Sequence, residues 1–314
     1  FWDGGAGTNN WTDANNWNPN GVPGSSADVR INIAANVTLS GTSTTITKLE
    51  LDHASATLTI ASDATLTVDG STSDGIRVEP GILTNNGTII IQNIGNGGSD
   101  NGIDVRTTFN NNGDITVDGT TDDGVVVYAG AVFNNNSGGT LTINNAGDFG
   151  LYIDTGGTSS TFNNDGTVTI NSAPDDAIRL ETGTLNNNSG GMIDINTPAD
   201  LGISILRLGD LNNAGSIDIS GAVSRYGIEL FNDTQIATLD NLNGGTIAIT
   251  SSAQDGLRVD NGTTVNNDGT LAINGSGTMD INVISGATFS NTTNGIFSPG
   301  TSPGTMSITG DMNF

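Results

Sequence analysis

The 314-residue chain contains no cysteine, and it has only 8 lysines and arginines against 33 aspartates and glutamates. The absence of cysteine excludes disulfide bonds and thiol chemistry. The shortage of cations leaves a formal net charge of −25, which repels the phosphates of nucleic acids and of anionic lipids. We therefore expect no nucleic acid among the partners of this chain.

Long apolar runs, helical periodicity and aromatic residues are also scarce. No stretch approaches the ~18 uninterrupted apolar residues needed to cross a bilayer, so no membrane insertion of this segment is expected. Aromatic residues make up 5% of the chain, whereas there are 45 glycines, a composition typical of turn-rich proteins. No leader peptide is recognisable in the opening "FWDGGAG", which we interpret as the start of a mature or trimmed fragment.

What the chain does contain is a repeated phrase of an apolar residue, asparagines, glycine and an alternating run. Examples are "FNNNSGGTLTI" (133–143), "FNNDGTVTI" (162–170) and "LNNNSGGMIDI" (185–195). The apolar residues that open the phrase are Leu83, Phe109, Phe133, Phe162, Leu185, Leu211, Leu239, Val265 and Phe289. A second phrase, such as "DGIRVE" (74–79), accompanies each copy upstream. Two phrases locked together at a spacing of ~25 residues indicate a structural repeat.

Both phrases alternate with a period of two, which is typical of half-buried strands. Two short strands cannot bury their apolar faces alone, but parallel stacking of successive repeats at ~4.8 Å buries them in a shared core. The sequence therefore predicts an all-β fold, a parallel, right-handed β-helix of about 11–12 coils. The asparagines and glycines are expected at the corner between the two strands, where positive φ is tolerated, and stacked asparagines can form amide ladders.

The two ends of the chain differ from its middle. Residues 1–28 contain all three tryptophans, which we expect to cap the first coil, the alternative being a tryptophan platform for sugar rings. The remainder, residues 29–314, is assigned to the β-helix. It is divided into short first coils (29–70), regular repeats (71–297) and the start of further coils that are expected to continue beyond Phe314 (298–314).

Aspartate recurs at the turn before the "GI" of the second phrase, as a predicted ladder of Asp74, Asp100, Asp123, Asp148, Asp176, Asp200 and Asp255. A residue that recurs in many units is expected to serve every unit, here by accepting backbone N–H bonds at the turn. Stacked carboxylates repel one another, and Ca²⁺ can relieve that repulsion. The candidate calcium ligands are Asp122, Asp123, Asp175 and Asp176, and no other cofactor is expected.

The outward residues of the "DGI" strand are mostly charged, aromatic or apolar. In one interpretation, cross-strand pairs such as Arg77 with Asp104 only register neighbouring coils. In the other, the row is a binding strip, because exposed aromatics beside arginine suit sugar or protein ligands. The candidate ligand-binding residues of this strip are Tyr128, Tyr152, Arg106, Arg179 and Phe231.

Catalysis is not expected from this sequence. Polysaccharide lyases and hydrolases also use β-helix scaffolds, and they need converging carboxylates and, for acidic substrates, basic residues. Here the aspartate pairs belong to the repeat, and His53, the only histidine, is predicted to lie in a turn. No P-loop, dinucleotide-binding glycine motif or His/Cys cluster is present. A polysaccharide-active lyase or hydrolase and a self-assembling filament subunit stay open as alternative functions.

Three phrases carry a family resemblance. "FSPGTSPGTMSITGD" (297–311) resembles a repeat of the passenger domains of bacterial autotransporters and related secreted β-helix adhesins. "WDGGAGTNNWTDANNW" (2–17) resembles the start of such proteins, and the "DGI" and "NNxGxLxI" phrases are similar to their coil repeats. The resemblance implies an extracellular segment on the bacterial cell surface, a rigid acidic stalk for attachment or assembly. The implied partners are surface glycans or proteins of other cells or matrix, or copies of itself.

Overall fold

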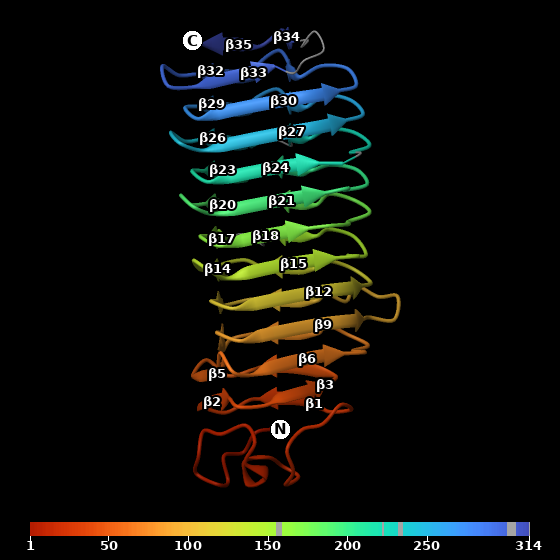
Figure 1. The fold of residues 1–314 in the computed structure, drawn as a ribbon, viewed down its shortest axis with the longest axis vertical. Coiled ribbons are helices and arrows are strands. Elements are labelled where there is room, and N and C mark those ends of the chain that lie inside the picture. The colour runs from red at the N-terminus through yellow and green to blue at the C-terminus, as the bar shows by residue number, and fades with distance from the viewer. Residues whose placement is uncertain (155–158, 222, 232–234, 300–305, 314) are drawn as a thin grey trace.

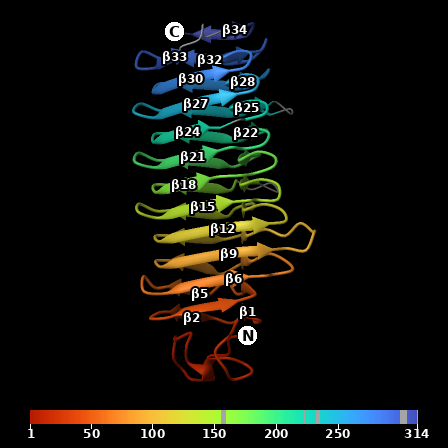
Figure 2. The ribbon, with the colours of Figure 1, turned by 45° about the vertical axis from the view of Figure 1, so that its right-hand side comes forward.

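In the computed structural model, three parallel sheets wind into one β-solenoid, with the N-terminal residues at one end (Figure 1). The structure describes residues 1–154, 159–221, 223–231, 235–299 and 306–313. Within these ranges two sheets have 12 strands and the third has 11, which makes eleven complete coils and two strands of a twelfth. The predicted all-β parallel solenoid and its number of coils are confirmed, and the coils stay stacked in both views (Figure 2).

Each complete coil adds one strand to each sheet. The charged sheet consists of β1 (Asp28–Ile31), β4 (Lys48–Leu51), β7 (Ile76–Val78), β10 (Ile103–Val105), β13 (Val125–Val127), β16 (Leu151–Ile153), β19 (Ile178–Leu180), β22 (Ile203–Leu206), β25 (Ile228–Phe231), β28 (Leu257–Val259), β31 (Ile281–Val283) and β34 (Met306–Ile308). The asparagine sheet consists of β2 (Ala35–Leu39), β5 (Ala56–Ile60), β8 (Ile82–Asn85), β11 (Thr108–Asn111), β14 (Val132–Asn135), β17 (Thr161–Asn164), β20 (Thr184–Asn187), β23 (Asp210–Asn213), β26 (Thr238–Asn241), β29 (Thr264–Asn267), β32 (Thr288–Asn291) and β35 (Asp311–Asn313). The threonine sheet consists of β3 (Ser43–Ile46), β6 (Thr65–Asp69), β9 (Thr88–Ile94), β12 (Asp114–Thr120), β15 (Thr140–Asn144), β18 (Thr167–Ile170), β21 (Met192–Asn196), β24 (Ser216–Ser220), β27 (Thr246–Ser252), β30 (Thr270–Ser276) and β33 (Ile296–Pro299).

The prediction of two strands per coil is wrong, because each complete coil has three. The asparagine phrase is itself a strand: in β17, Phe162 and Asn164 point inward while Thr161 and Asn163 are half-exposed. Its inward position after Phe162 is filled by an amide instead of an aliphatic side chain. In the sequence, the apolar alternation therefore ends at Phe162, whereas in the structure the strand continues to Asn164.

The glycines of the corners are required mainly by close packing. A Cβ on Gly166 would lie 2.2 Å from the carbonyl oxygen of Gly139 in the preceding coil, so no side chain fits there. Positive φ occurs in the longer corners, at Gly138 (85°) and Gly190 (95°) of the two "SGG" sequences and at Gly244 (87°) of "NGG". The expected left-handed geometry therefore belongs to the long corners, whereas Gly166 in its short corner is required by close contact alone.

The inward side chains form columns that run along the solenoid. The pairing register places Phe109, Phe133 and Phe162 directly above one another, as their spacing predicts. Adjacent ring centroids lie 4.8 and 4.9 Å apart, with interplanar angles of 8° and 15°. All three rings are fully buried, and stacking in contact adds to the hydrophobic stabilisation of each coil.

A ladder of inward asparagines runs beside the aromatic column. Each member donates an Nδ2–H to the Oδ1 of the next over 2.7 to 2.8 Å, through Asn85, Asn111, Asn135, Asn164, Asn187, Asn213, Asn241, Asn267 and Asn291. The second N–H of the amide bonds a backbone carbonyl of the next coil, as from Asn187 to Ser216 over 3.0 Å. The predicted amide ladder is confirmed. Because its members are buried, the loss of any one of these bonds would leave a polar group without a partner.

Residues 1–27, with the short 3₁₀ helix η1 (Ala14–Asn16), lie at the N-terminal end of the solenoid (Figure 1). Trp2, Trp11 and Trp17 are at most 2% exposed and join the same apolar core as the coils. They meet edge to face, with ring centroids 5.0 and 4.8 Å apart. The backbone N–H of Trp11 donates to Thr38 in β2, so this segment contacts the first coil, and none of the three indoles is exposed as a sugar platform.

At the other end, β34 and β35 continue the charged and asparagine sheets. Most of the "SPGTSPGT" phrase that carries the family resemblance, residues 300–305, lies outside the described residues. Over the described ranges, the structure contains no helix that is both long and apolar enough to span a bilayer.

Candidate functional site

The basic residues of the chain gather on one face. All eight lie in strands of the charged sheet or in the turns next to them: Arg30, Lys48, Arg77, Arg106, Arg179, Arg207, Arg225 and Arg258. The strands of the other two sheets therefore carry no positive charge. Because the whole chain is strongly acidic, this face is the part of the rod where a ligand meets both signs of charge.

The outward row of this face follows the predicted order. Strand pairing aligns Arg77, Asp104, Val126, Tyr152, Arg179, Ser204, Glu229 and Arg258 in successive coils. Its members are not equally accessible, since Asp104, Val126 and Ser204 are at most 3% exposed. The surface of the row is therefore uneven, because long side chains extend further outward than the short, buried ones.

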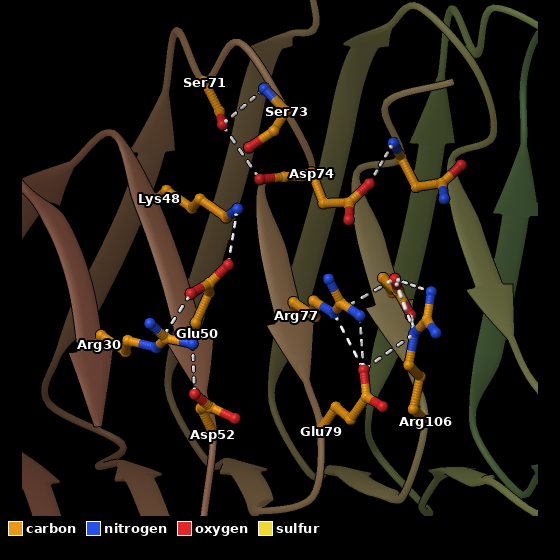
Figure 3. A network of polar contacts seen from close by, with 12 residues as sticks. Arg30, Lys48, Glu50, Asp52, Ser71, Ser73, Asp74, Arg77, Glu79 and Arg106 are labelled. Atoms are coloured by element: carbon orange, nitrogen blue, oxygen red, sulfur yellow. Dashed lines mark hydrogen bonds and ion pairs between the residues drawn. The ribbon is translucent and has the colours of Figure 1, made fainter. Parts of the chain in front are cut away.

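Ion pairs on this face form two separate groups in the first four coils, one in coils one and two and one in coils three and four (Figure 3). Arg77 and Arg106 both contact Glu79, at 2.6 and 3.3 Å, and Arg106 also contacts Asp104 at 3.0 Å. Burial raises the pKa of Asp104, although the guanidinium of Arg106 opposes that rise. One coil earlier, Lys48 lies 2.7 Å from Glu50. The Arg106–Glu79 contact and the Arg30–Glu50 contact, at 3.4 Å, join neighbouring coils, and these two support the interpretation that cross-strand pairs register the coils.

The aromatic members of the predicted strip already have partners within the chain. The Arg106 guanidinium lies 4.3 Å above the ring of Tyr128, a cation–π contact. The Tyr152 hydroxyl donates to Glu181 over 2.9 Å, and burial is the first cause that raises the pKa of both tyrosines. Phe231 differs, because 43% of it is exposed. Of the five candidate strip residues, Phe231 is the aromatic side chain most open to a ligand.

Sequence reasoning missed Tyr226, the third tyrosine. It is 7% exposed and lies between the guanidinium groups of Arg225 and Arg258, 5.1 and 5.2 Å from its ring centroid. Its position before the glycine holds aspartate in other coils, so it breaks the repeat. The sequence did hold a signal for this tyrosine, because "RYG" (225–227) departs from the "DDG" pattern of other coils. "DFG" (148–150), which contains Phe149, departs from it in the same way.

The seven aspartates predicted to form one turn ladder occupy two neighbouring columns. Strand register puts Asp74, Asp123, Asp176 and Asp255 directly before the residue that opens the "GI" phrase. Asp100, Asp148 and Asp200 stand one residue earlier, in line with Asp122 and Asp175. The inner column is the more buried one, with Asp123 at 6% and Asp176 at 2% exposure.

The inner column bonds to the next coil. Asp74 accepts the backbone N–H of Asn101 over 3.0 Å, and Asp123 accepts that of Phe149 over 2.9 Å. Asp176 instead accepts a hydrogen bond from the hydroxyl group of Ser204. Backbone N–H acceptance, the role expected for the ladder, is thus found at Asp74 and Asp123.

The two columns together form two acidic clusters, one of Asp122, Asp123 and Asp148 and one of Asp175, Asp176 and Asp200. In each, a carboxylate oxygen of every member lies within 4.8 Å of the others. The four candidate calcium ligands thus lie in two places, each completed by an aspartate of the following coil. Burial is the main cause that raises the pKa of Asp123 and Asp176 to about 7.

The donor set of the first cluster fits a hard cation better than that of the second. Three carboxylates supply oxygen ligands of the kind Ca²⁺ prefers, and water completes its six to eight positions. In the second cluster, Arg225 already lies 3.1 Å from Asp200, and Arg179 lies 3.8 Å from Asp176. These guanidinium groups compete for the oxygens that an ion would need.

Comparison with known proteins adds little to this geometry. No protein-family model matches the chain, and no curated protein matches it. Among solved structures, it is similar to the crystal structure of a TibC-catalysed, hyper-glycosylated TibA fragment, with 15% sequence identity over 91% of this chain and 97% of that one. The TM-score is 0.28, too low for the likeness to support an argument about function.

Proposed function

We propose that this chain is a non-enzymatic, extracellular segment of a bacterial surface adhesin, a rigid acidic stalk that attaches through its charged sheet. The partners would be glycans or proteins of other cells or of the matrix. The observation that carries this proposal is the gathering of all eight basic residues on one long face of a chain with a net charge of −25. Clustered charge of mixed sign gives specificity and orientation to an encounter.

The solenoid suits a stalk mechanically. The complete coils are joined by three parallel sheets, and from the third coil to the eleventh also by the buried asparagine ladder. Bending the rod would break buried hydrogen bonds that have no water to replace them. A rod of about 12 coils at ~4.8 Å per coil is about 55 Å long, enough to hold a binding face away from its point of attachment.

The test is a binding screen of the purified chain against immobilised glycans and matrix proteins at several salt concentrations. We expect binding that weakens with salt and that falls in a Tyr128→Ala/Tyr152→Ala double variant, because both rings support the charged face. A Thr142→Ala variant on the threonine sheet is the matched control and should bind normally. Equal binding by the double variant, together with loss in the control, would move attachment to another face.

A polysaccharide hydrolase is the second candidate, and one observation favours it. Burial raises the pKa of Asp176 to about 7, so this carboxyl can stay protonated near neutral pH, with the carboxyl group of Asp200 beside it. We nevertheless favour the adhesin, since Asp176 is 2% exposed and bonded to Ser204. Release of reducing ends from neutral or acidic polysaccharides, lost in Asp176→Asn, would establish the hydrolase instead.

A further inference from the structure

A hollow of about 340 Å³ opens on the charged sheet around Ser204. Strand pairing places Ser204 between Arg179 in the preceding coil and Glu229 in the following one. Both neighbours are long, whereas the serine side chain ends at a hydroxyl that is bonded to Asp176. The hollow therefore exists because a small residue stands in a row of large ones.

One edge of this hollow is apolar. Leu206 and Phe231 are paired in register at the ends of β22 and β25, and both line the hollow. Phe231 is 43% exposed, whereas Phe109, Phe133, Phe162 and Phe289 are fully buried in the core. An exposed aromatic ring beside a half-exposed leucine offers a surface for the C–H groups of a ligand.

The other walls carry donors and acceptors that hold one another in place. Arg225 lies 3.1 Å from Asp200 and 3.8 Å from Glu229, and Arg179 lies 3.8 Å from Asp176. A guanidinium group has five N–H donors, so several remain for a ligand.

Glu229 is an acceptor with capacity to spare. It is only 7% exposed, and its ion pairs, at 3.8 Å to Arg225 and 3.4 Å to Arg258, are long. Over the part of the chain that the structure describes, no donor makes a hydrogen bond to its carboxylate. Burial raises its pKa, as expected where the charged form lacks hydrogen bonds.

We propose that the Ser204 hollow is a subsite for one ring of a neutral saccharide. Hydroxyl groups of the sugar accept from Arg179 and Arg225 and donate to Glu229, while its apolar face packs on Phe231. The volume lies within the range of ~300–1,000 Å³ typical of small-molecule sites. This inference rests on the proposed attachment function and names the ligand class for one place on that face.

The charge of the hollow selects against acidic sugars. Four acidic side chains line it, those of Asp175, Asp176, Asp200 and Glu229, and even with Asp176 protonated they outnumber the two guanidinium groups. A sialylated or uronic-acid ring would bring a further negative charge to a lining that already has more negative than positive groups. A neutral ring can use the donors and acceptors without that repulsion.

The same face supplies a matched control. A second hollow of about 260 Å³ lies near the N-terminal end and is lined by Arg30, Glu50, Leu51, Asp52, Arg77 and Glu79. It has paired charges of the same kinds but no aromatic side chain, and Leu51 is buried. A variant there changes the charge of the face without touching the proposed subsite.

The experiment compares Phe231→Ala and Ser204→Tyr with Arg77→Ala on an array of neutral oligosaccharides and their sialylated counterparts. The neutral probes end in galactose, glucose, mannose or N-acetylhexosamine. We expect Phe231→Ala to weaken binding of a neutral probe about tenfold, which corresponds to about 1.4 kcal/mol. Ser204→Tyr should abolish binding by filling the hollow, as Tyr152 is accommodated in the same row, and Arg77→Ala should bind normally. Circular dichroism and thermal unfolding verify that each variant folds.

The other outcomes separate this inference from the proposed function. Neutral sugars that bind both subsite variants as tightly as the parent chain overturn the subsite and leave attachment intact. A preference for the sialylated probes also overturns it. If matrix proteins bind but no saccharide does, the subsite is wrong and the adhesin proposal stands; if nothing binds, both are wrong.

Discussion

The asparagine ladder inside the solenoid and the ion pairs on its charged face both connect one coil to the next, yet they differ in every other respect. The ladder repeats one residue type in a buried column, with eight bonds of 2.7 to 2.8 Å. The ion pairs are partly exposed and involve different residue types; Arg77, for example, contacts both Glu79, at 2.6 Å, and Asp104, at 3.9 Å. Buried polar groups must all be satisfied in the same way, whereas exposed ones have water as an alternative. The interior is therefore uniform, whereas the residues of the face can differ from coil to coil.

The largest expected effect is that of breaking the ladder at Asn187. Asn187→Ala removes the acceptor for Asn164 and the donor to Asn213, and it also leaves the carbonyl of Ser216 without its side-chain donor. Three groups without partners, at about 1–3 kcal/mol each, predict a loss of about 3–9 kcal/mol in the free energy of unfolding. Urea denaturation followed by circular dichroism measures it.

Asn186 is the matched control, since it is the adjacent residue and faces outward. It also belongs to a ladder, bonded to Asn163 over 2.9 Å and to Asn212 over 3.0 Å, but water can replace both bonds. Asn186→Ala should cost less than about 1 kcal/mol. Equal losses at both positions would contradict the claim that burial gives the ladder its importance.

The buried carboxyls predict a stability that depends on pH. Because the pKa of Asp123 and Asp176 is raised from 3.8 to about 7, the unfolded chain ionises at lower pH than the folded chain. Stability should therefore fall as the pH rises from about 4 to about 7, by at most about 4 kcal/mol for each carboxyl.

Asp176→Asn should flatten that dependence, giving a more stable protein at pH 8 and little change at pH 4. Thermal unfolding across this pH range is the measurement. Asp118→Asn, at an exposed position on the threonine sheet, should leave the slope as it is. A flat profile for the parent chain would mean that the two carboxyls are ionised in the folded state at low pH.

Calcium should act on the first acidic cluster more than on the second. With Ca²⁺ at ten times its dissociation constant, binding to the folded state alone would add about 1.4 kcal/mol. Asp122→Asn should remove this gain, while Asp175→Asn should retain most of it, because arginines already lie near the second cluster. A melting curve that is identical with Ca²⁺ and with chelator would exclude the site.

The smallest effect is expected on the charged face itself. Arg77 and Glu79 are 36% and 42% exposed, and exposed ion pairs contribute about 0–1 kcal/mol. Arg77→Ala should therefore change the free energy of unfolding by less than about 1 kcal/mol, with the difference shrinking further at high salt. A loss comparable to that of Asn187→Ala would show that the face is a structural element as much as the ladder is.

Part of the candidate site could be read from the sequence, and part could not. The order of the row from Arg77 to Arg258 follows from the repeat, since each member occupies the same place in its phrase. Exposure does not follow: Tyr152 and Phe231 look alike in the sequence, yet Tyr152 bonds to Glu181 whereas Phe231 is open. Whether a side chain is covered depends on the lengths of its neighbours in the coils on either side.

The chain's own repeat determined the solenoid. Its spacing of ~25 residues and its alternation predicted parallel coils, a shared apolar core and an amide ladder, because each is a local pattern multiplied by stacking. Only the tertiary structure decided that each complete coil has three strands, that the aspartates form two columns, and that a hollow lies over Ser204. Those features arise between residues about 25 positions apart, where register and side-chain length, which no single repeat encodes, set the distances.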